Sequence, residues 1–220
     1  MLLKTFVYTQ QRKQKFMFKH KLLAILIISG LLFCGKGLYM QSKAFVAQQL
    51  LSFAWARHLQ SGQLYKAWPW ADSAPLAKLT FPGEEPLIVL SGATGSNLAF
   101  APSWMRASTP FAQGGNSVIV AHNDTHFNQL KGVKLDDKLQ VSTYGNARLF
   151  YQVTDMKIVD ETDISVIENN GDELLTLITC YPFDSAIYNS DKRFVVTAKR
   201  IKDDRSPLTV AMVNNELRQY

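Results

Sequence analysis

The pattern of apolar and polar positions divides the chain into a helical amino-terminal part and a longer part that is rich in strands. Between Lys43 and Gln60, apolar residues recur at spacings of three and four with polar residues between them, which predicts a helix that ends at Ser61-Gly62. The preceding run, Leu22 to Gly35, is almost entirely apolar or small. We expect one continuous helix through both stretches.

After this helix the pattern changes to short strands separated by turn signals. A connector rich in Trp and Pro, Lys66 to Pro75, comes first, and we expect Trp68 and Trp70 to pack it onto the following domain. Clusters of Gly, Pro, Asn and Asp then separate the strand-like runs, which favours a single all-β barrel or sandwich. Only Leu98 to Met105 reads as a short helical turn. The predicted strands are Ala77–Phe81, Leu87–Leu90, Ser117–Ala121, Lys138–Ser142, Ala147–Lys157, Leu174–Thr179 and Arg193–Ile201.

The net charge of +6 lies in the amino-terminal tail. Residues 1–21 hold six of the 24 Lys and Arg residues and no acid, and the first acidic residue is Asp72. The rest of the chain carries 18 basic and 18 acidic residues and is therefore neutral. A neutral body gives no support for a nucleic-acid partner.

A basic tail followed by an apolar run is typical of an amino terminus that inserts into a membrane. The apolar run that starts at Leu22 is short for a span of roughly twenty residues, but it reaches Met40 if the Lys36 side chain extends to the interface. A signal peptide that is removed and an uncleaved anchor are the two interpretations, and the weak cleavage pattern favours the anchor. The positive-inside rule then places residues 1–21 in the cytoplasm and the chain after about Met40 outside.

Cys180 is the one thiol of the strand-rich part. It follows the apolar run Leu174–Thr179 and precedes Tyr181-Pro182, where proline stops the strand, so we expect its side chain at a rim. The other cysteine, Cys34, would lie in the bilayer, so the two cannot pair within one chain. A free thiol in a compartment that favours disulfides is a liability, which gives weight to a reactive role beside that of a buried structural cysteine.

Two further residues supply what a cysteine nucleophile needs. His122 ends the apolar run NSVIVAH, and an imidazole can take a proton from the thiol or stabilise the thiolate. Arg193 opens the run RFVVTAKRI, and a fixed guanidinium stabilises the negative charge that acyl transfer builds on a carbonyl oxygen. Either residue alone reads equally well as a solvated surface side chain, so the argument depends on the three occurring together.

A metal centre is the rival interpretation of the same region. His122, Asp124 and His126 offer three ligands within a short stretch, and alternate residues of a strand share a face. A hydrolytic metal site also needs further ligands or a supporting shell, and no histidine follows His126. We therefore expect no metal site here.

The three residues lie in segments that resemble the sortases, the cysteine transpeptidases of bacterial surfaces. TLITC, Thr176–Cys180, matches the TLxTC signature of that family. IVAHNDTHF, Ile119–Phe127, is similar to its histidine segment, with Ala121 where the family has the glycine of AGH, and KRFVVTAKR, Lys192–Arg200, resembles the strand that carries its arginine. The resemblance covers about residues 40–200, and AWARHLQSG, PWADSAPLAKL and GATGSNLAFAP are similar to the subgroup of marine Gram-negative bacteria.

The resemblance implies an all-β fold, a closed eight-stranded β-barrel, with an N-terminal transmembrane helix and a helical linker. The expected layout is a basic cytoplasmic tail (1–21), a transmembrane anchor (22–40), a helical segment with connector (41–74) and a catalytic β-barrel (75–220). Such a protein is expected to cross the bacterial inner membrane once, with its catalytic domain on the periplasmic, extracytoplasmic side.

The resemblance also implies the roles of the site residues. Cys180 would be the nucleophile, His122 the general acid and Arg193 the stabiliser of substrate and oxyanion, while Thr179 would line the site as a substrate-binding residue. The expected substrate is an exported protein with a C-terminal LPxTG-like sorting signal, and an amine acceptor of unknown identity would receive it from the thioacyl-enzyme. No organic cofactor is needed, and no acidic cluster justifies predicting calcium.

Two other functions remain open from the sequence. A thiol endopeptidase would use the same residues with water as the acceptor. An anchored β-barrel binding module would carry Cys180 as an inert thiol.

Overall fold

The structure is a computed structural model of the 220-residue chain, and it describes residues 2–143, 147–184 and 190–201. The side chains of residues 2–20 and of scattered positions as far as 41, Cys34 among them, lie outside this description, as do the last residues of the predicted barrel domain, 202–220. The chain divides into two compact units, Met1–Ala47 and Gln48–Tyr220.

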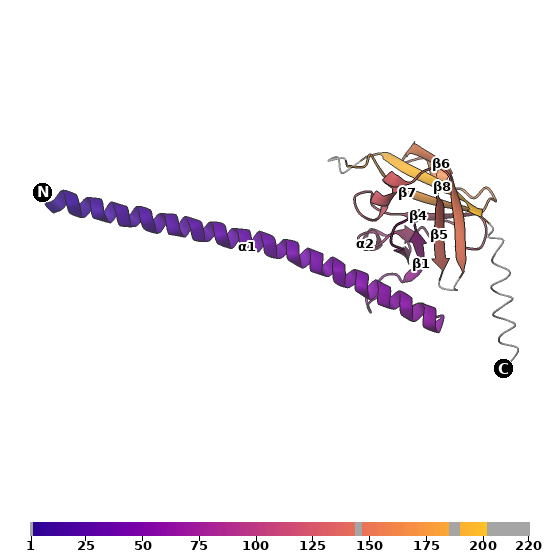
Figure 1. The fold of residues 1–220 in the computed structure, drawn as a ribbon, viewed down its shortest axis with the longest axis horizontal. Helices are drawn as coiled ribbons and strands as arrows, with labels where there is room; N and C mark the ends of the chain where they lie inside the picture. Colours follow the sequence, from indigo (N-terminus) through magenta and orange to yellow (C-terminus); the bar gives the residue numbers. More distant parts are fainter. Residues whose placement is uncertain (1, 144–146, 185–189, 202–220) are drawn as a thin grey trace. The chain divides into compact units, whose positions relative to one another are not determined.

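The amino-terminal part forms one helix, α1, from Leu2 to Ser61 (Figure 1). The predicted continuity of the helix is confirmed, and so is its end: the N–H of Gly62 donates to the carbonyl of His58 at 2.9 Å, with φ +68° at the glycine. Within the described part of the chain, none of the helices combines the length and the apolar content that crossing a membrane requires. The anchor at residues 22–40 stays a prediction.

The last turns of α1 and the connector pack onto the strand-rich unit. Leu51 and Trp55 are buried in one apolar cluster with residues of β2 and of the segment before β3. Trp68 packs edge-to-face on Phe100, with ring centroids 5.2 Å apart, as predicted. The prediction is wrong for Trp70, which is 80% exposed. The chain turns at this point, with the N–H of Ala71 donating to the carbonyl of Trp68, and the turn leaves Trp70 in solvent.

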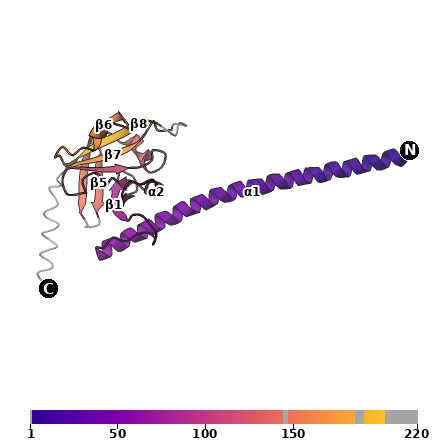
Figure 2. The same ribbon diagram turned by 180° about the vertical axis from the view of Figure 1, so that it is seen from behind.

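The rest of the described chain forms a closed barrel with the strand order β1-β2-β3-β4-β7-β8-β6-β5, and the predicted eight-stranded closed barrel is confirmed (Figures 1 and 2). One short helix, α2 (Gly95–Leu98), and two 3₁₀ segments, η1 (His126–Gly132) and η2 (Ile164–Ile167), lie in its connections. The strands are β1 (Pro75–Thr80), β2 (Leu87–Ser91), β3 (Ser103–Trp104), β4 (Asn116–Val120), β5 (Lys138–Thr143), β6 (Arg148–Asp160), β7 (Leu174–Tyr181) and β8 (Lys192–Ile201).

Among the described strands, β3 is the one that the sequence pattern missed. The run Leu98 to Met105 was expected to form a helical turn, but α2 ends at Leu98 and β3 occupies Ser103 and Trp104. A strand of two residues is too short to show an alternating pattern. Its existence depends on pairing with distant strands, parallel to β2 and antiparallel to β4.

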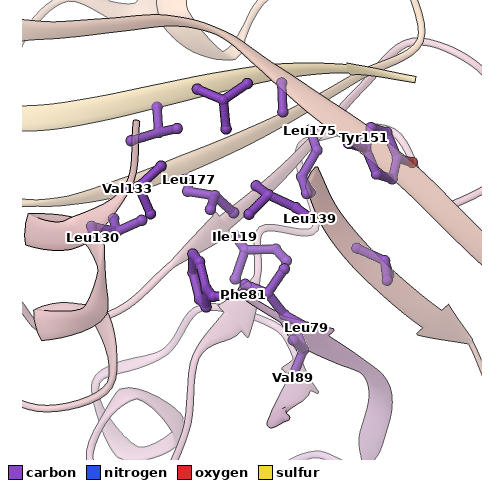
Figure 3. Close-up of a cluster of buried hydrophobic side chains, with 14 of the residues drawn as sticks. Leu79, Phe81, Val89, Ile119, Leu130, Val133, Leu139, Tyr151, Leu175 and Leu177 are labelled. Atoms are coloured by element: carbon purple, nitrogen blue, oxygen red, sulfur yellow. The ribbon is translucent and has the colours of Figure 1, made fainter. Parts of the chain in front are cut away.

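Alternate residues of the strands that carry the candidate site point to opposite faces of the barrel wall. Leu175 and Leu177 of β7 point into the barrel, where they meet Ile119 of β4 and the other residues of the main core (Figure 3). The intervening residues point outward. Val118, Ile178 and Val195 form a second buried cluster on that outer face, against which η2 packs through Val166 and Ile167. The outer faces of β4, β7 and β8 are therefore apolar where these three residues meet.

Candidate active site

Strand pairing brings the three predicted site residues to one end of three adjacent strands. Cys180 on β7 lies directly opposite Arg193 on the antiparallel strand β8. On the other side of β7, the parallel pairing of β4 matches Val120 with Ile178, and the N–H of Ala121 donates to the Ile178 carbonyl at 3.3 Å. Extending that register by two residues brings His122 level with Cys180.

The three side chains also share a face. The neighbouring positions lie inside: Ala121 belongs to the main core of the barrel, Phe194 packs against it, and Thr179 is buried. Because successive residues alternate, Cys180, His122 and Arg193 project from the outer face instead. There Cys180 is half-buried and His122 is exposed.

Contacts beyond the strand ends hold the histidine and cysteine segments together. The side-chain amide of Asn123 donates to the carbonyl of Pro182 at 3.0 Å. Lys131 in η1 forms an ion pair with Asp184 at 2.5 Å, and its ammonium lies 5.6 Å from the ring centroid of Phe183. These contacts join the residues that follow His122 to those that follow Cys180.

The two threonines of TLITC link β7 to β4. Thr176 donates its hydroxyl hydrogen to Oδ1 of Asn116, and Thr179 donates to the carbonyl of Ala121, both at 2.7 Å. Thr179, which was expected to line the site, is 2% exposed and lies on the face of β7 opposite to Cys180, and its substrate-binding role stays a prediction. The physical reason is the period of the strand, which turns adjacent residues to opposite faces. Its hydroxyl fixes the residue that precedes His122.

Alanine at position 121 fits the local backbone. The described residues other than glycine that have a positive φ are Ala112, Asp136 and Asp184, so the φ of Ala121 lies outside the left-handed region. Glycine is required only where that region or a close approach is needed. The difference from the AGH pattern therefore introduces no backbone strain.

The guanidinium of Arg193 makes three hydrogen bonds with described residues. Its Nη1 donates to the carbonyls of Ser190 and Lys192 at 2.6 and 2.9 Å. Its Nη2 donates to the Glu161 carboxylate at 2.6 Å. Sequence reasoning missed Glu161, which follows β6 and meets Arg193 only because β6 pairs with β8.

Asn116 is a second residue that the sequence did not point to. It is 2% exposed at the start of β4, and its amide donates to the carbonyls of Val166 and Glu168 at 3.0 and 3.3 Å. With Thr176 bound to its oxygen, Asn116 fastens the segment between β6 and β7 to the strands beneath it. No local sequence pattern predicts these hydrogen bonds, because the partners of Asn116 are about fifty residues away in the chain.

The rival metal constellation does not assemble in the described residues. Among them, no three His, Cys, Asp or Glu side chains gather closely enough to hold a metal ion. Burial lowers the pKa of His126; a hydrogen bond with the Phe100 backbone opposes this shift, the nearby His122 adds to it and Asp124 opposes it. His126 is therefore a neutral, half-buried side chain at neutral pH, four residues beyond the exposed His122.

Comparisons with known proteins agree with the fold. The family described as "Sortase domain" matches residues 83–201. Sortase D of Bacillus subtilis is 35% identical over 91 residues, which are 40% of this chain and 44% of that protein. Sortase A of Listeria monocytogenes is 32% identical over 123 residues, which are 54% of this chain and 53% of that protein. The chain thus spans about half the length of these curated relatives.

A solved structure gives a fuller match. The crystal structure of Listeria monocytogenes sortase A is similar to this chain with a TM-score of 0.52 and 30% sequence identity. The match covers 58% of this chain and 88% of that one. The match therefore takes in most of the solved relative.

Proposed function

The chain belongs to the sortase family, and from this premise we propose that it is a cysteine transpeptidase with Cys180 as nucleophile, His122 as general acid and Arg193 as stabiliser of the oxyanion. One observation supports the proposal: β7 and β8 pair Cys180 with Arg193, and the register of β4 with β7, extended by two residues, brings His122 level with Cys180. Thiol, imidazole and guanidinium are the groups that an acyl transfer through a thioester requires.

The proposed reaction has two steps. The Cys180 thiolate attacks the carbonyl carbon of the scissile peptide bond, Arg193 faces the oxygen that becomes negative, and His122 gives its proton to the departing amine. A thioester to Cys180 and a neutral imidazole remain. An incoming amine then attacks the thioester, its proton passes to His122, and the thiolate leaves with the new amide complete. Because one group must be deprotonated and the other protonated, the rate should follow a bell-shaped pH profile.

The proposed substrate is an exported protein with a C-terminal LPxTG-like sorting signal, cleaved between Thr and Gly. The outer face offers an extended peptide the side chain of Val120, which is only partly buried, whereas Val118 and Val195 are already buried in the cluster against which η2 packs. Apolar side chains of a peptide strand can pack on such a surface. The acceptor is specified only as a molecule with a nucleophilic amine.

We further propose that the protein acts while held at a membrane, with its barrel on the extracytoplasmic side and its anchor at residues 22–40. The basic tail, the apolar run and the unbroken helix α1 support this arrangement. Confinement to the membrane that also carries the exported target raises the effective concentration of both. Membership of the marine Gram-negative subgroup is part of the same proposal and is supported by the short segments quoted above.

The direct test is to incubate the full chain with an LPxTG-type peptide, with and without an excess of a simple amine, and to weigh the protein and the peptide products. A transpeptidase gives a thioester adduct on Cys180 and an amide product when the amine is present. The full chain is used because Leu51 and Trp55 of α1 are part of a buried cluster. Cys180→Ala is the control and should give neither species.

The same experiment separates the two alternatives. A thiol endopeptidase would release only the free acid, whatever the amine concentration. A binding module would show no adduct, and its Cys180 would also fail to react with a thiol-directed probe. Either outcome would overturn the transpeptidase proposal.

A further inference from the structure

Strand β8 places Arg193 between Cys180 on one side and the carboxylate of Glu161 on the other. In the barrel order, β8 lies between β7 and β6, and the three strands run side by side in both views (Figures 1 and 2). Across the β7 ladder the partner of Arg193 is Cys180, and across the β6 ladder it is Val159. Glu161 follows the end of β6, two residues after Val159. The nucleophile and this carboxylate therefore stand on opposite sides of β8.

The guanidinium is bound on the Glu161 side. Arg193 has five N–H donors, of which three are taken by the carbonyls of Ser190 and Lys192 and by the carboxylate of Glu161. The backbone N–H of Glu161 also donates to the carbonyl of Asp191 at 2.6 Å. This backbone bond holds the carboxylate next to the guanidinium, so the pair is built by two connected segments of the fold.

A carboxylate in that position opposes the proposed role of Arg193. The positive charge that would stabilise an oxyanion at Cys180 is compensated by a negative charge 2.6 Å away. We propose that Glu161 is a positioning residue that holds Arg193 in a resting pose on the β6 side, and that Arg193 leaves this ion pair when substrate binds. This inference rests on the function proposed above and adds a residue that sets how often Arg193 is free.

The exposure of the pair makes it a reversible contact. The side chains of Arg193 and Glu161 are 27% and 47% exposed. Ion pairs at such positions are weak and are screened by salt. Substrate binding can therefore release Arg193 at small cost, and the effect of removing the pair is bounded: the fraction of free Arg193 rises by roughly two- to five-fold.

The first experiment compares kcat and KM of the full chain with those of Glu161→Gln. Asp160→Asn is the matched control, because Asp160 precedes Glu161 and pairs with Lys192 at 3.0 Å without touching Arg193. We expect kcat/KM to rise roughly two- to five-fold in Glu161→Gln and to stay unchanged in Asp160→Asn. Added salt should raise kcat/KM of the unchanged protein and of the control, and it should not raise that of Glu161→Gln. A fall in kcat/KM in Glu161→Gln, or the same salt response in all three proteins, would overturn the proposal.

A second experiment does not require the transpeptidase reaction. Cys180 is alkylated with iodoacetate, which is anionic, and with iodoacetamide, which is neutral, and the ratio of the two rates reports the positive charge near the sulfur. Glu161→Gln should raise this ratio roughly two- to five-fold over that of Asp160→Asn, which removes the same charge one residue away. The rise should vanish when Arg193→Gln is added to Glu161→Gln. An equal ratio in both single variants would reject the resting pose, whereas absence of any peptide adduct with the expected ratios would reject only the proposed function.

Discussion

At the residue scale, the hydroxyl of Thr179 matters because of where it is anchored. It donates to the carbonyl of Ala121, the residue before His122, and so joins the strand of Cys180 to the segment of His122. The bond is buried, with Thr179 2% exposed, and no water can replace it without rearrangement. The threonine before the cysteine therefore acts on the geometry of the histidine.

Replacing this threonine gives a prediction with an isosteric control. Thr179→Val keeps the shape of the side chain and leaves the Ala121 carbonyl without its buried donor, which should cost about 1–3 kcal/mol in the free energy of unfolding. Activity towards an LPxTG-type peptide should fall roughly ten- to hundred-fold as His122 is displaced. Thr179→Ser keeps the hydroxyl and should retain most of both. Urea denaturation and peptide cleavage measure the two effects, and equal behaviour of Val and Ser variants would refute the role of the bond.

His126 makes the stability of the barrel depend on pH. Burial lowers its pKa below the ordinary value of 6.5, so the folded protein favours the neutral ring. The unfolded chain binds more protons just below pH 6.5, and the free energy of unfolding therefore falls as the pH drops through that value. Above it the stabilisation is complete. Burial also lowers the pKa of His58, which contributes in the same window.

The His126→Gln variant isolates this contribution. Denaturation curves at several pH values between 5.5 and 7.5 should show a shallower decline in stability for His126→Gln than for the unchanged protein. The carboxyls of Asp160 and Asp163 do not interfere, because hydrogen bonds from Lys192 and Ser165, respectively, lower their pKa values and their effect belongs below pH 3.8. Parallel curves for both proteins would show that His126 does not titrate as its burial requires.

At the element scale, Asn116 attaches the segment between β6 and β7 to the barrel by hydrogen bonds. One buried amide holds two carbonyls of that segment and accepts from Thr176. Asn116→Ala should therefore speed amide hydrogen exchange in residues 161–173 by at least tenfold, while β7 and β8 stay protected. Thr176→Val removes only the hydrogen bond that Thr176 donates to Asn116, and it should increase the exchange rate less. Unchanged exchange in this segment would mean that Val166 and Ile167 hold it without Asn116.

The last turns of α1 are a second element whose role can be measured. Trp55 is 4% exposed against the barrel unit, whereas Phe53, two residues earlier, is 61% exposed. Trp55→Ala should lower the free energy of unfolding by about 3–5 kcal/mol because it opens a cavity in a packed cluster. Phe53→Ala should change it by no more than about 0.5 kcal/mol. Similar losses in both variants, measured by urea denaturation, would show that the helix end is not part of the barrel's core.

How far the sequence predicts these elements depends on the range of the contacts involved. Leu174–Thr179 is recognisable as a strand because its signal is local, and the TLITC motif within it locates the thiol. Ser103–Trp104 is not, since a strand of two residues is defined by its partners. The same applies to the site: Glu161 carries no pattern that connects it to Arg193, 32 residues away.

At the scale of the whole molecule, the basic and acidic residues are distributed unevenly along the chain. The +6 excess lies in residues 1–21, and the remainder is balanced. A barrel without net charge suits the mainly apolar peptide proposed above as its substrate. A basic segment with no acid is suited to the cytoplasmic side of an anionic membrane.

This division leads to a prediction for the intact chain. If residues 22–40 anchor it, the full-length protein should remain in the membrane fraction after washing with high salt or alkaline carbonate, and only detergent should release it. A variant that starts at residue 41 retains Leu51 and Trp55 and should appear in the soluble fraction with the same reactivity of Cys180 towards iodoacetamide. The variant that lacks only residues 2–21 discriminates further, because a protein held by its basic tail alone would lose the membrane while an anchored one would keep it. Release of the full-length chain by salt would reject the anchor and leave the chemistry of the barrel untouched.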